Sequence, residues 1–184
     1  MEKKLRQAKD ELIKIVLYGP ESTGKTSLAR ALALEYNTKW VPEFARDYLQ
    51  DKYNTSAEIC EPEDLIPIAK GQLQSENFKA RSAKQYVFCD TNVLQTLVYA
   101  KAYYKNFQDK ILEQCAEECH YAHYFLTYID TPWVEDDLRD KPHQRKSMFT
   151  IFEQELIQRN LPYTILKGDL KQRLYQAASI IKTL

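Results

Sequence analysis

Short apolar runs alternate along this chain with longer segments in which apolar residues recur every three or four positions. The short runs predict strands, and the longer segments predict helices with one buried face. The predicted strands lie at about residues 14–18, 40–44, 86–91, 124–129 and 163–166. The predicted helices lie at about residues 27–36, from 46 onward, and at 62–83, 92–107, 110–119, 145–158 and 170–181. Such alternation is typical of an α/β fold with a mainly parallel sheet between layers of helices.

Two of the predicted helices have features that affect their shape. Pro67 and Gly71 interrupt the segment 62–83, where we expect a kink or two separate pieces. In the last helix we expect Asp169 to cap the first turn. The face of that helix expected to be buried carries Leu170, Leu174, Ala177 and Ile181.

The chain has 184 residues, enough for one domain with a substantial core, and we expect a single domain over 1–184. Residues 1–13 form a charged lead-in in which we expect a short helix. Residues 131–146 are polar, bounded by proline and dense in both charge signs, which suits a lid that closes over a site. The alternative is a surface loop with salt bridges, since charge runs are often merely solvated.

Residues 19–26 read Gly-Pro-Glu-Ser-Thr-Gly-Lys-Thr, which is the pattern of a phosphate-binding P-loop. A β-forming run precedes it and a helix-forming run follows it, so backbone N–H groups of the loop can converge on phosphate oxygens. We expect Lys25 to reach the β- and γ-phosphates of ATP and the Thr26 hydroxyl to bind Mg²⁺. The residues expected to hold the nucleotide are Gly19, Glu21, Ser22, Thr23, Gly24, Lys25, Thr26, Ser27 and Gly168.

Carboxylates follow several of the predicted strands, at the edge of a parallel sheet where ligands bind. Asp90 closes a buried strand as a Walker-B aspartate does, and we expect it to act in catalysis and to contact Mg²⁺; the alternative is a plain helix cap. Glu43 is the candidate to orient or deprotonate a substrate hydroxyl, with Asp47 in reserve. The alternative for Glu43 is a solvated carboxylate. Arg46 follows on the same segment and joins the substrate-binding set.

The expected lid supplies cations and an aromatic side chain. Arg139 and Arg145 could fold over the transferring phosphoryl group and neutralise its charge. Trp133, with Asp136 among the acidic residues after it, suits a flat, positively charged ring. The alternative for Trp133 is ordinary packing.

Composition narrows the class of partner. Equal numbers of acidic and basic residues give zero net charge, which argues weakly against nucleic acid. No apolar run approaches a membrane span or a signal peptide, so we expect a cytoplasmic protein with reduced cysteines.

Cys115, Cys119, His120 and His123 lack the loop spacing of known zinc sites, and we favour a helix end running into a strand. The guanine-specific N-K-x-D motif is absent, and the chain is short for an AAA-type motor.

Four segments together resemble a known family, the ribosylnicotinamide kinase domain of NadR-type proteins. They are 19–26, the run Trp-Val-Pro-Glu-Phe-Ala-Arg-Asp-Tyr at 40–48, Phe-Cys-Asp-Thr at 88–91, and Asp-Thr-Pro-Trp-Val-Glu-Asp-Asp-Leu-Arg-Asp at 130–140. The resemblance implies a P-loop fold with strand order 2-3-1-4-5. It also implies ATP-dependent phosphorylation of the 5′-hydroxyl of nicotinamide riboside, with Trp133 against the nicotinamide ring.

NadR-type proteins often carry an adenylyltransferase domain, whose H-x-G-H-type motif is not found in this sequence. We therefore expect a stand-alone kinase or an excised domain that acts on a small molecule, with its oligomeric state unassigned. Two alternatives stay open, namely a kinase for another nucleoside or nucleotide, and an ATP-binding regulator of NAD metabolism without turnover.

Overall fold

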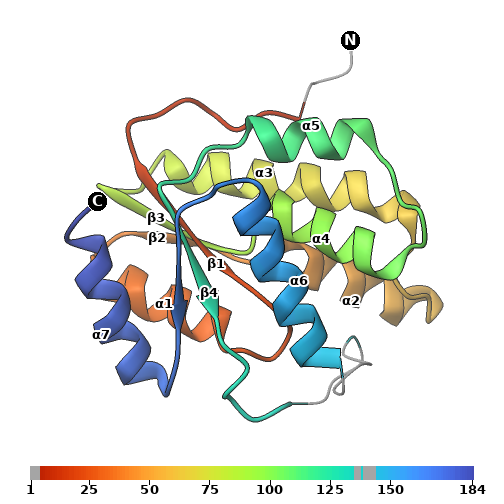
Figure 1. Ribbon diagram of the computed structural model, residues 1–184. Coiled ribbons are helices and arrows are strands. Elements are labelled where there is room, and N and C mark those ends of the chain that lie inside the picture. The colour runs from red at the N-terminus through yellow and green to blue at the C-terminus, as the bar shows by residue number, and fades with distance from the viewer. Residues whose placement is uncertain (1–4, 135–137, 139–143) are drawn as a thin grey trace.

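The computed structural model describes residues 5–134, 138 and 144–184. Asp136 and Arg139 lie outside the described residues, together with half of the expected lid. The described chain forms three layers, in which helices cover both faces of one twisted sheet (Figure 1). None of the helices in the described ranges is long and apolar enough to cross a membrane.

The sheet is parallel throughout and has the strand order β2-β3-β1-β4-β5. This order confirms the α/β fold and the strand order that the resemblance implies. Buried parallel strands have no solvent-facing side, which is why the chain shows them as nearly continuous apolar runs. The strands are β1 (Ile13–Tyr18), β2 (Lys39–Val41), β3 (Tyr86–Asp90), β4 (His123–Thr127) and β5 (Tyr163–Leu166).

Helices α1 and α7 cover one face of the sheet, and the remaining helices cover the other face (Figure 1). Each face has its own hydrophobic core. Leu28, Leu32 and Ala177 belong to the first core, while Leu73, Leu97 and Phe152 belong to the second. The helices are α1 (Lys25–Glu35), α2 (Phe44–Ser56), η1 (Pro62–Asp64), α3 (Leu65–Ala80), α4 (Val93–Tyr103), α5 (Lys110–Glu118), α6 (Arg145–Gln158) and α7 (Leu170–Ile181).

The second strand is shorter than the sequence pattern predicts. It ends at Val41, and Phe44 is already the first residue of α2. Pro42 has no N–H to continue the ladder, so the strand stops there. The Phe44 N–H instead donates to Gln72 Oε1 at 2.8 Å, which ties the start of α2 to α3.

The expected break in the helix after Pro62 is not at Pro67 or Gly71. A single turn, η1, precedes α3, and α3 then runs without interruption from Leu65 to Ala80. Pro67 is the third residue of α3. A backbone N–H at this position would have no partner within the helix, so proline costs no hydrogen bond here. Gly71 is buried, and a Cβ placed there would lie 2.1 Å from the Phe44 ring.

The buried face of α7 differs from the predicted one. Leu170 is 44% exposed, whereas Arg173 is 2% exposed and shares the inner face with Ala177 and Ile181. The capping prediction is confirmed, because Asp169 accepts from the Gln172 N–H at 2.8 Å.

Residues 5–12 contain no helix, contrary to expectation, and lie across the amino-end edge of the sheet. Gln7 donates to the buried Glu76 carboxylate at 2.7 Å and accepts from the His120 N–H at 2.9 Å. Lys14 pairs with Glu76 at 3.4 Å and with Asp10 at 2.9 Å. These polar contacts hold residues 5–12 in place. They also give the buried Glu76 carboxylate two of its partners, Gln7 and Lys14.

We predict that Gly71→Ala destabilises the protein. Alanine favours a helix over glycine by about 1 kcal/mol, but the new methyl group must displace the Phe44 ring, and overpacking costs about 1–3 kcal/mol. The expected net loss is roughly 1 kcal/mol in urea unfolding. Ser75→Ala, one turn further along α3, is the control and should stay close to wild type. An unchanged or increased stability for Gly71→Ala would show that Phe44 moves freely.

Candidate functional site

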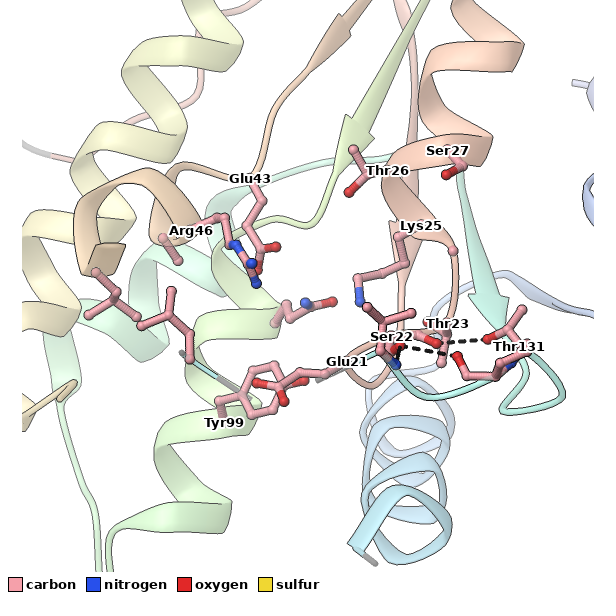
Figure 2. Close-up of a pocket in the computed structure, with 17 residues that line it drawn as sticks. Glu21, Ser22, Thr23, Lys25, Thr26, Ser27, Glu43, Arg46, Tyr99 and Thr131 are labelled. Atoms are coloured by element: carbon pink, nitrogen blue, oxygen red, sulfur yellow. Dashed lines mark hydrogen bonds between the residues drawn. The ribbon is translucent and has the colours of Figure 1, made fainter. Parts of the chain in front are cut away.

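A cavity of about 460 Å³ opens at the carboxyl ends of the strands, between the P-loop, α2 and α4 (Figure 2). Most of the residues predicted to hold the nucleotide line it, and so do Glu43 and Arg46 from α2 and the turn before it. The lining residues are Glu21, Ser22, Thr23, Gly24, Lys25, Thr26, Ser27, Glu43, Ala45, Arg46, Leu49, Gln95, Tyr99, Thr131, Pro132, Val134 and Leu138.

The P-loop takes the backbone conformation that its glycines allow. Gly19 has φ +130°, and a Cβ there would lie 3.2 Å from the Thr127 carbonyl oxygen of β4. Gly24 has φ +81° and stands directly before the first residue of α1. Both conformations are ones that residues with a Cβ rarely adopt. The loop therefore passes from strand to helix in one tight turn, as the sequence pattern predicts.

Two side chains of the loop donate hydrogen bonds to the loop's own backbone. Thr23 Oγ1 donates to the Pro20 carbonyl at 2.8 Å and lies 2.7 Å from the Thr127 hydroxyl. Lys25 Nζ donates to the same Pro20 carbonyl at 2.7 Å and is only 7% exposed. The ammonium group thus sits inside the loop, where an arriving phosphate would compete with a neutral carbonyl for it.

Thr26 and Asp90 meet as expected of a pair that binds a divalent cation. Thr26 Oγ1 donates to Asp90 Oδ2 at 2.5 Å, and Asp90 Oδ1 is buried without a hydrogen-bond partner among the described residues. A hydroxyl and a carboxylate oxygen are the kind of ligands that Mg²⁺ prefers. The donor set fits Mg²⁺, with Thr26 and Asp90 as the residues that would hold it.

The Asp90 carboxyl is held in an unfavourable environment. Burial, and after it the negative charge of Glu43, raises its pKa to about 7 against the opposing effects of Lys25 and Thr26. Asp90 does not cap the following helix. That role belongs to Asn92, whose side chain accepts from the Gln95 N–H at 3.2 Å.

The far wall of the cavity carries carboxylates around an aromatic ring. Glu43 and Arg46 face Lys25 across the cavity, and Glu21 lies against Tyr99 (Figure 2). Burial raises the pKa of Tyr99 well above its usual range, and the charges of Glu21 and Glu43 raise it further. Glu21, which belongs to the P-loop in sequence, therefore turns toward this wall.

The start of the expected lid is bound to the P-loop through Ser22. Thr131 Oγ1 donates to the Ser22 carbonyl at 2.7 Å, and the Val134 N–H donates to Ser22 Oγ at 2.9 Å. Trp133, in the same segment, is half-buried and is not among the residues that line the cavity. The guanidinium of Arg145 lies over its ring, 5.7 Å from the centroid.

Two residues predicted for the site have partners other than the ones expected. Arg145 begins α6 and donates to the Ser22 and Thr131 carbonyls, both at 3.0 Å, instead of lining the cavity. Gly168, with φ +92°, donates its N–H to Asp130 Oδ2 at 2.6 Å. Asp130 also accepts from Arg173, so this strand-end carboxylate is occupied by protein groups.

Sequence reasoning missed three residues that shape the site. Gln95 accepts from the Gly19 N–H at 3.2 Å, Tyr99 lies in the far wall of the cavity, and Arg173 donates to the Thr23 carbonyl. The spacing of Arg173 from Ala177 and Ile181 was a usable signal, because residues four apart share a helix face. Gln95 and Tyr99 are likewise four residues apart on α4.

The cysteines and histidines of residues 115–123 do not come together in the folded chain as a set of metal ligands would. Within the described residues there is no group of three or more cysteine, histidine or acidic side chains that could hold a metal ion. His120 is exposed, and His123 lies 2.9 Å from the Thr164 hydroxyl. The four cysteines are free thiols.

We predict that Asp90→Asn stabilises the ligand-free protein in a pH-dependent way. Because the folded-state pKa lies above the unfolded value, wild-type stability falls as pH rises from about 4 to about 7. Asparagine removes that loss. The increase in the free energy of unfolding over wild type should therefore be larger at pH 8 than at pH 5, by on the order of 2 kcal/mol. Thermal unfolding in a chelator at the two pH values measures it. Asp51→Asn, at an exposed position, is the control; equal gains at both pH values would contradict the prediction.

Comparisons with known proteins agree with this geometry. The NadR protein of Salmonella typhimurium, a trifunctional NAD biosynthesis/regulator protein, is 26% identical over 171 residues, covering 91% of this chain and 42% of NadR. The chain thus spans less than half the length of the curated relatives it matches. These relatives confirm the resemblance to NadR-type proteins that the motifs indicate.

Solved structures show the same fold. A NadR crystal structure in complex with NR has a TM-score of 0.77 at 22% identity, covering 94% of this chain and 51% of that chain. Thymidylate kinase from Candida albicans has a TM-score of 0.71 at 14% identity, covering 96% and 93% of the two chains. A family model described as AAA domain matches residues 14–173; this description concerns the domain and does not test whether the chain is a motor. Because that match covers most of the sequence, the chain belongs to the AAA domain family.

Proposed function

We propose that this chain is an ATP-dependent kinase that transfers the γ-phosphoryl group to the 5′-hydroxyl of nicotinamide riboside, giving nicotinamide mononucleotide and ADP. The observation that carries the proposal is that a phosphate-binding loop and an acidic, aromatic wall face each other across one cavity. A donor and an acceptor bound there would be held together, as in-line phosphoryl transfer requires. The likeness to NadR proteins in sequence and fold supports this choice of acceptor.

On the donor side, the N–H groups of the P-loop would bind the phosphates of ATP. Lys25 would exchange the Pro20 carbonyl for phosphate oxygens, moving its ammonium only within the loop. Thr26 and Asp90 would hold Mg²⁺, which would supply positive charge to neutralise the phosphates. Arg139, in the undescribed part of the lid segment, remains our candidate for a cation that closes over the transferring group.

On the acceptor side, Glu43 would orient the ribose hydroxyl and accept its proton. The hydroxyl oxygen forms a bond to the γ-phosphorus while the bond to the β-phosphate oxygen breaks, and ADP leaves. Glu43 stands immediately before the first residue of α2, next to Arg46, which would position the ribose or the transferring group. The nearby Asp90 carboxyl is the alternative base, since its raised pKa suits proton transfer near neutral pH.

Negative charge around the aromatic wall favours a cationic ring. The negative charges of Glu21 and Glu43 both raise the pKa of Tyr99. The positively charged nicotinamide ring would be attracted to such a wall, whereas a neutral pyrimidine would not. We retain Trp133 and Asp136 as proposed contacts of the ring, carried by the lid segment. In the described state Trp133 packs on Arg145, so binding the ring would require that segment to shift.

A kinase for another nucleoside or nucleotide is the second candidate. The fold shared with thymidylate kinase favours it, because that protein is named for a different acceptor. An ATP-binding regulator without turnover is the third candidate. A panel of charged and neutral nucleosides with MgATP separates all three.

We predict that the wild-type chain forms nicotinamide mononucleotide from MgATP and nicotinamide riboside, and that Lys25→Ala abolishes this activity. The variant should remain folded, because Lys25 is the first residue of α1, lines the cavity and belongs to neither hydrophobic core. Product formation is followed by chromatography, and Lys110→Ala on the exposed face of α5 is the control. Turnover on a neutral nucleoside but none on nicotinamide riboside would favour the second candidate, and ATP binding without any turnover the third.

We predict that Glu43→Gln lowers kcat about 100-fold, which is the usual order for losing a general base. Asp51→Asn is the matched control, since Asp51 is an exposed carboxylate on α2, the helix that begins directly after Glu43. The KM for ATP should change little in either variant. A near-normal kcat for Glu43→Gln would move the proton-accepting role to Asp90 or Asp47.

A further inference from the structure

Two arginines hold two consecutive carbonyl groups of the P-loop. Arg145 donates to the Ser22 carbonyl at 3.0 Å, and Arg173 donates to the Thr23 carbonyl. The arginines come from different helices, α6 and α7, and lie 123 and 150 residues away from their partners in the sequence. Their guanidinium groups are near enough that the charge of Arg173 lowers the pKa of Arg145, after burial as the larger cause.

Arg173 is the more completely enclosed of the two. It is 2% exposed, and its other N–H groups donate to the Gly168 carbonyl at 2.9 Å and the Tyr128 carbonyl at 3.0 Å. Its charge is balanced by Asp130 at 2.5 Å. One guanidinium therefore joins the P-loop to the ends of β4 and β5.

Arg145 reaches the loop from the first residue of α6. Besides the Ser22 carbonyl it binds the carbonyl and hydroxyl oxygens of Thr131, at 3.0 and 3.3 Å. Thr131 in turn donates to the Ser22 carbonyl at 2.7 Å. The Ser22 carbonyl thus accepts two hydrogen bonds, one of them from a charged donor.

The geometry of the peptide unit gives these contacts a consequence for phosphate binding. In a trans peptide the C=O and the following N–H point in opposite directions. Holding the Ser22 and Thr23 carbonyls toward the arginines therefore turns the N–H groups of Thr23 and Gly24 the opposite way. Both of these residues line the cavity.

The loop needs this support because its backbone is not relaxed. Ser22 has φ +55°, a left-handed conformation that costs free energy for a residue with a Cβ. A strained conformation persists only where surrounding contacts over-determine it. The two guanidinium groups supply charge-assisted hydrogen bonds, which are stronger than those between neutral groups.

We propose that Arg145 and Arg173 are positioning residues that hold the P-loop in its phosphate-binding shape before the nucleotide arrives. They act on the carbonyl side of the loop, through the backbone, and need no contact with the substrate. The proposal rests on the proposed function only in that ATP is the ligand whose phosphates the loop holds. Its effect is on the affinity for ATP and not on the acceptor.

The test compares Arg173→Lys, Arg145→Lys and Arg159→Lys in the full chain. Lysine keeps the charge but cannot reach several carbonyls in a fixed fork. Arg159 is the control, because it is a largely buried arginine that pairs with Glu113 on α5 and Glu155 on α6 and does not line the cavity. Calorimetry gives the Kd for MgATP without acceptor, kinetics gives KM for each substrate, and thermal unfolding reports folding.

We expect Arg173→Lys and Arg145→Lys each to raise the Kd and KM for ATP about tenfold or more, the change for losing a charge-assisted hydrogen bond. The KM for the acceptor should stay within about twofold, and Arg159→Lys should leave both substrates' constants unchanged even if it lowers Tm. If Arg173→Lys does not fold, Arg145→Lys, at a half-buried helix start, carries the test.

Two results would overturn the proposal. An ATP Kd within twofold of wild type in folded Arg145→Lys and Arg173→Lys would show that the loop keeps its shape without them. Equal losses in the Arg159→Lys control would show a general effect of stability. Failure of the wild-type chain to bind ATP at all would instead contradict the proposed function, so the two failures are distinguishable.

Discussion

The pairing of β1 with β3 and β4 is the constraint on which the site depends. Leu17 lies opposite Asp90 on one side and opposite Phe125 on the other. Because parallel strands end at the same edge, the P-loop leaves β1 between the ends of its two neighbours. Asp90 can then reach Thr26, 64 residues away in the sequence, at 2.5 Å. Hydrophobic cores on both faces of the sheet fix this edge and the residues that it carries.

Gathering charged groups at that edge costs free energy, and the protein offsets most of the cost with specific partners. Lys25 binds a loop carbonyl, and Arg173 binds Asp130 together with three carbonyls. Asp90 is one exception, since one of its oxygens has no hydrogen-bond partner among the described residues and its pKa is about 7. Such an imbalance is typical of sites that are completed by a ligand.

The fold followed from the sequence because its signals are local. Buried parallel strands appear as apolar runs, and the helices show the spacing of one buried face, so the order of strands and helices from β1 onward was predicted correctly. The errors fall where distant contacts decide. Phe44 joins α2 because its N–H finds Gln72, and Gly71 stands inside α3 because the Phe44 ring packs where its Cβ would lie. Neither fact is visible in the residues next to them.

The sequence by itself determined the phosphate-binding loop, since the conformations of Gly19 and Gly24 and the places of Lys25 and Thr26 follow from neighbouring residues. It also identified Asp90 and Glu43 as strand-end carboxylates. Only the tertiary structure decided that Glu21 turns toward Tyr99 and that Arg173 is buried against the loop. The physical reason is that backbone conformation and hydrophobic periodicity depend on adjacent residues. The partner of a buried polar side chain depends on which distant segments the packed core brings beside it.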